Sequence, residues 1–211
     1  MQAIISRKDF RKLAVLPACA ASFEGDRGGF TGICLKFTQK SLVGYSTNAV
    51  LLARREVSLA SCDIPVSIWV KASDLSQAIK SLDGMETIGI GLDGSQLAFV
   101  QGEKIYTAKI LIPATFDFEI VLRHWSTFSE DVEVSRKDLL GSLANGTERR
   151  ATIVIGGKFY DVDRKLLTRC VRSIQERRIV LEGDEPDRAI RISAPGLAIL
   201  MMPMKSDGGA R

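Results

Sequence analysis

The side chains that most clearly suggest a binding function are cationic, and they recur at helical spacing. In residues 6–18, Arg7 and Arg11 lie four apart, as do Lys8 and Lys12, beside an apolar stripe that includes Phe10. The predicted helices at 6–18, 71–82, 135–145 and 163–178 carry net charges of +3, +1, +1 and +4, in a chain whose total is +4. The remainder is therefore acidic.

One cationic surface on an acidic remainder is typical of a protein that meets a polyanion. The alternative is that Lys and Arg simply favour exposed helix faces. The candidate phosphate contacts on these helices are Arg7, Lys8, Arg11, Lys12, Lys80, Arg136, Lys137, Arg164, Lys165, Arg169 and Arg172.

Other chemistry finds little support in the sequence. Gly89 to Gly94 spells GxGxxG, but the apolar run after it reads as a strand, so we expect a hairpin turn and no dinucleotide site. The four cysteines form no CxxC pair, and His124 is the single histidine, so we expect no metal or other cofactor. No nucleophile or acid–base constellation stands out, and we expect no enzymatic activity.

The polar helices belong to a unit that the chain repeats four times. Each copy is a strand, a polar position and a helical start, and its strand ends at Ile5, Val70, Val134 or Val162. The copies therefore begin 65, 64 and 28 residues apart. Ser6 and Ser135 each precede an aspartate by three residues and predict side-chain caps. Three strands follow three of the helices, but only one, Arg150–Ile155, follows the third.

These units predict an α+β fold in two domains, residues 1–125 and 126–211, with antiparallel sheets and helices on one face. Residues 113–131 read as the connector. A chain of 211 residues with 45% apolar and 26% charged residues is ordinary for a globular protein, and no apolar run approaches a membrane span. Residues 14–20 resemble a secretion signal, but Pro17 interrupts a short apolar stretch. We expect a cytoplasmic protein with free thiols and no membrane partner.

Several strings resemble the bacterial sliding clamp, the β subunit of DNA polymerase III. The ending Leu200-Met201-Met202-Pro203-Met204-Lys205 is similar to the Val-Val-Met-Pro-Met-Arg ending of that family. Thr47 to Ala53 takes the place of its Thr-Asp-Gly-His-Arg-Leu-Ala string. The resemblance covers nearly the whole chain, but only the last two of the family's three domains. It departs where Asn48, Ala49 and Leu51 replace the family's Asp, Gly and Arg.

The resemblance implies a DNA-clamp-like fold whose helices face duplex DNA without reading its sequence. It also implies a groove that takes short linear peptides from a DNA polymerase, clamp loader or repair protein. Carried over, that groove is formed by Phe30, Thr47, Val50, Leu51, Leu52, Leu200, Met201, Met202, Pro203 and Met204. The plain alternative is that residues 200–202 are only a core strand.

The sequence thus predicts a replication or repair processivity factor that encircles or lies along DNA and tethers partners. Two domains per chain would need three chains to supply six domains, so a homotrimer is the expected ring. Closing the ring would require an edge strand that pairs with the neighbouring chain, and the shortened third unit lacks strands that could include this edge. Phe159–Val162 is one candidate for the edge strand. The main rival is an interaction module that binds peptides or other clamp subunits without forming a ring. An enzyme on a β-rich scaffold is a remote third reading.

Overall fold

The computed structural model describes residues 2–20, 32–63, 65–82, 84, 86–113, 117–125 and 127–204. The helices are α1 (Arg7–Lys12), α2 (Val15–Cys19), α3 (Ala72–Ser81), α4 (Phe118–His124), α5 (Arg136–Ala144) and α6 (Arg164–Ser173). Residues 2–125, the first half, contain β1 (Gln2–Ser6), β2 (Gly32–Phe37), β3 (Ser41–Thr47), β4 (Leu51–Ser58), β5 (Ser61–Cys62), β6 (Val66–Lys71), β7 (Thr87–Asp93), β8 (Gln96–Gln101) and β9 (Lys104–Leu111). Residues 127–204, the second half, contain β10 (Glu130–Ser135), β11 (Arg150–Ile155), β12 (Lys158–Asp163), β13 (Arg178–Gly183), β14 (Ile190–Ala194) and β15 (Leu197–Met201).

The repeated unit is a strand that runs directly into a helix, as predicted: β1 into α1, β6 into α3, β10 into α5 and β12 into α6. Ser6 caps α1 by accepting a hydrogen bond from the main-chain N–H of Asp9 at 3.0 Å. Asp163 caps α6 in the same way through Leu166, also at 3.0 Å. The predicted cap at Ser135 is wrong, because its side chain makes no capping hydrogen bond to α5.

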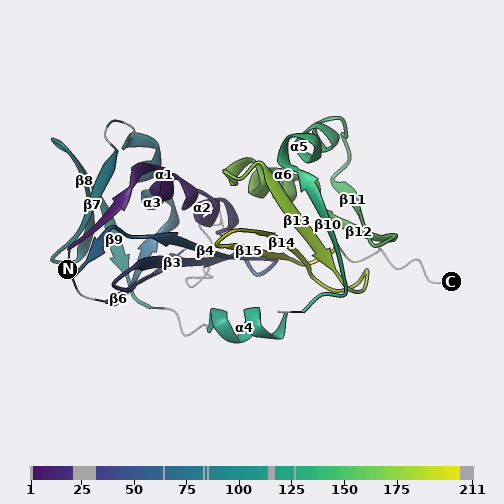
Figure 1. Ribbon diagram of the computed structural model, residues 1–211, viewed down its shortest axis with the longest axis horizontal. Helices are drawn as coiled ribbons and strands as arrows, with labels where there is room; N and C mark the ends of the chain where they lie inside the picture. Colours follow the sequence, from purple (N-terminus) through teal and green to yellow (C-terminus); the bar gives the residue numbers. More distant parts are fainter. Residues whose placement is uncertain are drawn as a thin grey trace.

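The sheet topology follows one rule in both halves. The strand that precedes one helix pairs with the strand that follows the other, so β1 pairs with β7 and β6 with β2. In the second half β10 pairs with β13 and β12 with β11. The halves join where β4 and β15 pair antiparallel, and a 13-stranded sheet results. Figure 1 shows α1, α2, α3, α5 and α6 along the upper side of the molecule and α4 below the sheet. This arrangement confirms the α+β, clamp-like prediction.

The third unit is short because it lacks one helix and the outer strands that follow the first helix of the first half. After α5 the chain forms β11, turns at Gly156 and Gly157, and returns as β12 in a separate two-stranded sheet. Both glycines have positive φ, 57° and 78°, as a tight hairpin turn requires. The equivalent segment of the first half contains α2, β2, β3, β4 and β5. Within residues 127–204, α2, β3, β4 and β5 have no counterpart.

Three predicted boundaries are wrong. The segment 113–131 was expected to be a plain connector but contains α4, capped by Asp117, whose carboxylate accepts from the main-chain N–H of Glu119 at 2.9 Å. The helix predicted at 6–18 is two helices separated at 13–14. The helix predicted at 163–178 ends at Ser173, so Arg177 and Arg178 do not lie on it.

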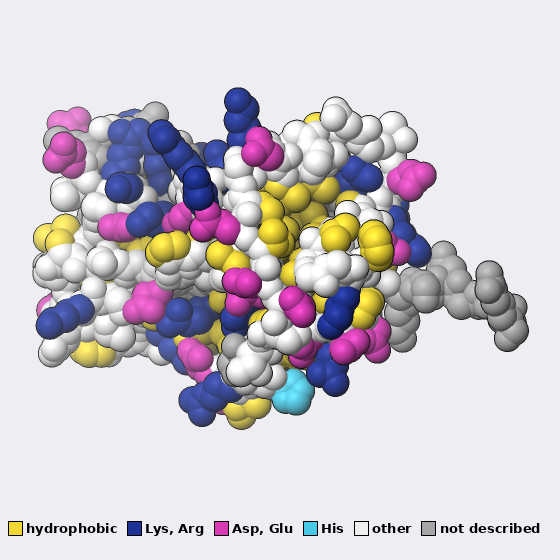
Figure 2. All heavy atoms as spheres, turned by 45° about the vertical axis from the view of Figure 1, so that its right-hand side comes forward, with side chains coloured by type: hydrophobic (Ala, Val, Ile, Leu, Met, Phe, Trp, Pro, Cys, Tyr) yellow, Lys and Arg dark blue, Asp and Glu magenta, His cyan; other side chains and the backbone are white. Residues whose placement is uncertain are grey.

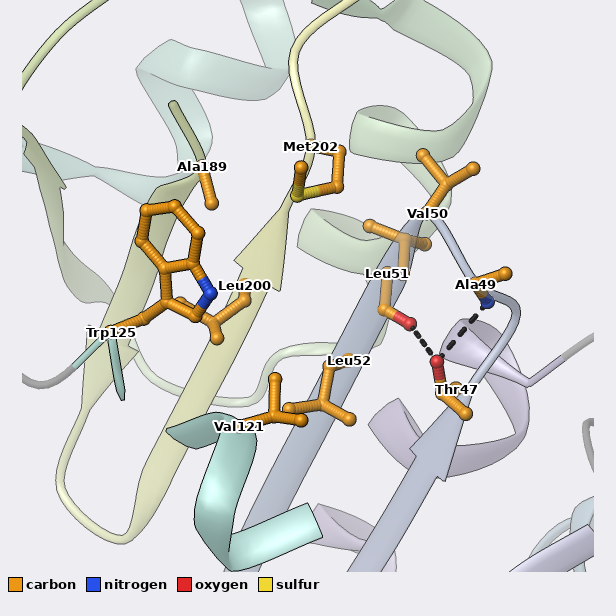
Figure 3. Close-up of a pocket in the computed structure, with 10 residues that line it drawn as sticks. All are labelled: Thr47, Ala49, Val50, Leu51, Leu52, Val121, Trp125, Ala189, Leu200 and Met202. Carbon is orange, nitrogen blue, oxygen red and sulfur yellow. Dashed lines mark hydrogen bonds between the residues drawn. The ribbon is translucent and has the colours of Figure 1, made fainter. Parts of the chain in front are cut away.

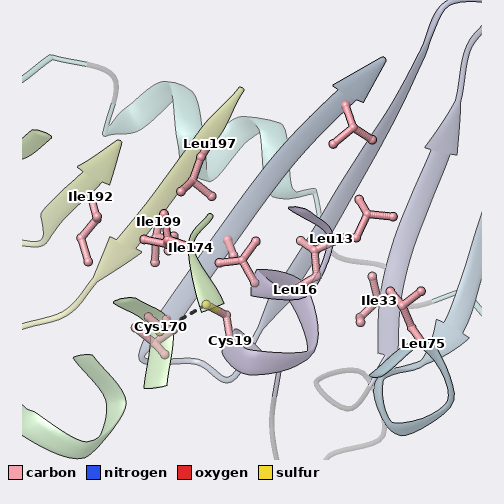
Figure 4. Packing of buried hydrophobic residues seen from close by; sticks show 14 of the residues in the cluster. Leu13, Leu16, Cys19, Ile33, Leu75, Cys170, Ile174, Ile192, Leu197 and Ile199 are labelled. Carbon is pink, nitrogen blue, oxygen red and sulfur yellow. Dashed lines mark hydrogen bonds between the residues drawn. The ribbon is translucent and has the colours of Figure 1, made fainter. Parts of the chain in front are cut away.

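Figure 4 shows the hydrophobic core where the two halves meet. Leu13 and Leu16 lie on the side of Ile33 and Leu75, whereas Cys19 lies next to Cys170 of the second half. Ile174 and Ile199 belong to the same cluster in the second half. Each of these side chains is at most 1% exposed. Burial of this apolar surface is what holds the halves together.

Candidate partner groove and helix face

A groove of about 260 Å³ opens beside the strand pair that joins the halves. Leu52 of β4 and Leu200 of β15 are directly paired across this joint and form its floor. They belong to a second apolar cluster that also contains Tyr45, Trp69 and Phe118. The groove therefore exists because two halves of the chain place apolar side chains side by side.

One wall of the groove is a rigid turn between β3 and β4. The Thr47 hydroxyl donates to the carbonyl of Leu51 at 2.6 Å and accepts from the main-chain N–H of Ala49 at 3.1 Å (Figure 3). The Asn48 side chain accepts from the main-chain N–H groups of Val50 and Leu51 at 3.0 and 2.7 Å. Ala49 has φ +72°, the left-handed region that disfavours residues with a Cβ. These side-chain bonds hold the turn in spite of that conformation.

The opposite wall comes from α4. Figure 3 shows Val121 of this helix and Trp125, the residue that follows it, pointing toward the floor, while Met202 closes the upper end near Val50. The α4 helix is fixed to the sheet, because the Tyr45 hydroxyl donates to the Glu119 carboxylate and the ring of Tyr45 stacks on Phe118 with centroids 5.2 Å apart. Burial and the bond to Glu119 raise the pKa of Tyr45 far above its ordinary value, so it stays a neutral donor.

The predicted groove residues are placed as follows. The structure brings together six of them, Thr47, Val50, Leu51, Leu52, Leu200 and Met202. Met201 is fully enclosed in the main core, and Phe30 lies outside the described residues. Pro203 and Met204 lie beyond the lining, and the main-chain N–H of Met204 donates to Asp161 of β12 at 2.8 Å.

Four lining residues were absent from the predicted set: Ala49, Val121, Trp125 and Ala189. A signal for α4 was present, since Phe118, Val121, Leu122 and Trp125 have the i, i+3, i+4, i+7 spacing of an amphipathic helix. Ala189 carries no such signal, because its position at the groove depends on the path that the chain takes between β13 and β14. The lining is apolar apart from Thr47, and such a groove suits an aliphatic or aromatic ligand.

The cationic residues lie on the opposite side of the sheet from α4. Lys8, Arg11, Lys80, Lys137, Lys165 and Arg172 are exposed on α1, α3, α5 and α6. Figure 2 shows a group of Lys and Arg side chains at the upper left of the molecule, and Figure 1 places α1 and α3 at the upper left, whereas further Lys and Arg side chains lie lower in the view. A polyanion along that side would meet several of the four helices at once.

Other predicted cations are engaged within the protein. The guanidinium of Arg164 donates to the carbonyls of Leu143, Glu148 and Arg150 at 3.0, 2.8 and 3.1 Å, so it fixes the end of α5 and the start of β11. Arg136 donates to the carbonyl of Ile174 at 2.5 Å. Lys12 pairs with Asp9 at 2.6 Å, and Arg7 and Arg169 are partly buried. Arg164 therefore has a structural role, which sequence spacing did not indicate.

No family profile and no curated protein sequence matches the chain. Solved structures do. The DNA polymerase sliding clamp of Bacillus subtilis superposes with a TM-score of 0.82 at 15% identity, over 98% of this chain and 64% of that one. The DNA polymerase III subunit beta of Pseudomonas aeruginosa gives 0.80 at 15%, over 97% and 66%. The beta chain of Streptococcus pneumoniae DNA polymerase III gives 0.80 at 12%, over 98% and 65%.

This chain thus spans less than two thirds of the length of each of these proteins, and the identities are low enough that the likeness concerns the fold. No helix in the described residues is long and apolar enough to cross a membrane. The architecture of repeated strand–helix units, joined edge to edge in one sheet, is that of the DNA polymerase III beta sliding clamps.

Proposed function

We propose that this protein is a sliding-clamp-like processivity factor that tethers partner proteins to duplex DNA. The observation that carries the proposal is the groove lined by Leu52, Val121, Trp125, Leu200 and Met202, which is apolar and built from both halves. A long thioether such as Met202, 42% exposed at the rim, adapts to differently shaped ligands. The expected ligand is a short aliphatic or aromatic segment of a polymerase, clamp loader or repair protein.

A peptide titration tests this reading. A fluorescein-labelled peptide with two leucines and a phenylalanine should bind with saturable anisotropy, and Met202→Ala should weaken binding about tenfold because an apolar contact at the rim of the groove is lost. Ile120→Ala is the matched control, since Ile120 is 63% exposed on α4 and is not among the groove residues. Equal binding by the wild type and Met202→Ala, or equal loss in both variants, would place the ligand elsewhere.

The exposed cations of the helix side support non-specific contact with phosphates. Each neutralised phosphate contributes about 0.9 to the log–log salt slope of DNA binding. Replacing Lys165 and Arg172, which are both exposed on α6, by Ala should therefore reduce the slope by up to about 2 with no change in sequence preference. Arg123 and Arg188, which are exposed away from these helices, make the control pair. A slope that the helix pair leaves unchanged would favour the second candidate.

That second candidate is a clamp-like interaction module that binds peptides without encircling DNA. The shortened third unit favours it, because residues 127–204 have no counterparts of β3, β4 and the two-residue strand β5. Peptide binding without salt-dependent DNA binding would identify this function.

A further inference from the structure

Trp125 carries the one side-chain donor in the groove lining that the protein itself does not use. Among the described lining residues, only Thr47 and Trp125 have an O–H or N–H group in the side chain. The Thr47 hydroxyl donates to the carbonyl of Leu51. The indole N–H of Trp125 has no acceptor among the described residues. Because an indole N–H taken out of water normally has a partner, this one is available to a ligand.

The indole ring of Trp125 is held in a fixed orientation. Figure 3 shows its nitrogen on the side of the ring that faces Leu200, with the six-membered ring directed toward Ala189. The ring makes an edge contact with His124, with centroids 5.3 Å apart, and packs on the apolar cluster beneath the groove. Trp125 directly follows α4, which its contacts with Tyr45 fix to the sheet. The donor is therefore in place before a ligand binds, and its ordering costs no affinity.

The main chain around the groove gives a ligand no free edge to pair with. The N–H groups of residues 48–51 all donate to the carbonyl of Leu51 or to the side chains of Thr47 and Asn48. The N–H of Met202 donates to the same turn at 2.9 Å. In the floor, β4 pairs with β3 and β15, and β15 pairs with β4 and β14. A ligand therefore cannot bind here by adding a strand to the sheet.

A peptide in this groove needs a donor for its own main chain. The groove volume of about 260 Å³ is below the roughly 300 Å³ at which pockets for drug-sized ligands begin, so it encloses only a short segment. Apolar contacts lie at both ends, at Leu52 and Val121 below and at Val50 and Met202 above, and Figure 3 places Trp125 between them. A main-chain carbonyl that crosses between the two ends loses water, which is costly unless a donor replaces it.

We propose that the indole N–H of Trp125 donates to one main-chain carbonyl of the bound peptide and thereby sets which peptide side chain enters each end of the groove. The inference rests on the proposed function, and it adds the residue that fixes the register of the peptide. The ligand class follows from it. The groove takes a short apolar segment held by a single hydrogen bond to its main chain, and it does not take an added strand.

Replacing the peptide's amides by esters tests the bond. In the labelled peptide each main-chain amide is changed in turn to an ester, whose carbonyl is a weaker acceptor. With the wild type, one position should raise the Kd about two- to tenfold more than the others, the range of a single neutral hydrogen bond. With Trp125→Phe, which keeps an aromatic ring but loses the N–H, that position should cost no more than the rest. The ratio isolates the bond, because the smaller ring weakens all peptides alike. Trp69→Phe is the matched control and should keep the wild-type pattern.

The indole N–H itself gives a second readout. The chain has two tryptophans, so a ¹H–¹⁵N spectrum contains two indole signals, and each Trp→Phe variant assigns one of them. Peptide binding should move the Trp125 indole proton downfield and leave the Trp69 signal in place. The ester peptide with the largest cost, at a saturating concentration, should reverse most of that movement, because its weaker carbonyl takes the place of the acceptor.

The outcomes separate the register from the function of the groove. Saturable peptide binding with the same ester costs in the wild type and Trp125→Phe would overturn the proposal but leave the groove as the binding site. An indole signal that no ester peptide alters would do the same. A wild type that binds no peptide would overturn both. Far-UV circular dichroism equal to wild type verifies that the variants are folded. If Trp125→Phe does not fold, the indole signal of the wild type, assigned through Trp69→Phe, decides the question.

Discussion

The Sγ atoms of Cys19 and Cys170 lie 3.3 Å apart across the junction between the two halves. Cys19 comes from α2 and Cys170 from α6, and both side chains are fully enclosed. The hydrogen bond to Cys170, together with burial, raises the pKa of Cys19, so the Cys19 thiol stays neutral. The junction is therefore closely packed at this point.

Thiol labelling should report that packing. Cys62 is half-buried, whereas Cys19, Cys34 and Cys170 are buried, so an aromatic disulfide reagent should modify Cys62 first. The other three should react only as the protein opens, at a rate that rises with urea. Cys62→Ser should remove the fast phase, and a fast phase that survives this substitution would show that the junction is open in solution.

A buried ion pair crosses the same junction. Arg55 of β4 is 1% exposed and donates to the Glu176 carboxylate at 2.5 Å. Glu176→Gln should lower the free energy of unfolding by about 3–5 kcal/mol, because it leaves a buried guanidinium without a charge partner. The double variant Arg55→Met/Glu176→Met should recover much of that loss. Urea denaturation measures both, and a loss of under about 1 kcal/mol for the single variant would mean that the pair is solvated.

The turn at the groove carries strain that one substitution should remove. Ala49 adopts φ +72°, which costs a residue with a Cβ about 1 kcal/mol relative to glycine. Ala49→Gly should therefore raise the midpoint of thermal unfolding, while Ala60→Gly, outside the turn at an exposed position, should not. A lower midpoint for Ala49→Gly would indicate that the Asn48 and Thr47 bonds absorb the strain fully.

Glu182 should make stability depend on acid pH. Burial alone would raise its pKa, but hydrogen bonds from Arg191 and Ser193 outweigh burial and hold the pKa below the ordinary 4.5. The folded pKa lies below the unfolded one, so this contribution is complete above the unfolded pKa and is lost as pH falls through the folded pKa. The stability gap between wild type and Glu182→Gln should therefore narrow from pH 7 toward pH 3. A constant gap in urea denaturation across that range would contradict the assignment.

Much of this fold could be predicted because the same unit is repeated. Strand runs that end at Ile5, Val70, Val134 and Val162, followed by polar caps and helices, locate four helices and the shortened third unit. The groove could be predicted only in part, because Met201, the last residue of β15, is buried in the core, whereas the next residue, Met202, lines the groove. The sequence pattern does not tell which of the two faces the groove. Arg164 shows the same limit, since its three carbonyl partners come together only in the folded chain.

Tryptophan fluorescence tests the central claim, that the groove binds partner peptides, most directly. Trp125 points into the groove, whereas Trp69 is 6% exposed in the cluster beneath it. Titration of an aliphatic and aromatic peptide should shift the emission to shorter wavelength with saturation, as Trp125 leaves water. Trp125→Phe should abolish this shift and Trp69→Phe should preserve it. A shift that persists in Trp125→Phe, or no shift at saturating peptide, would contradict the account.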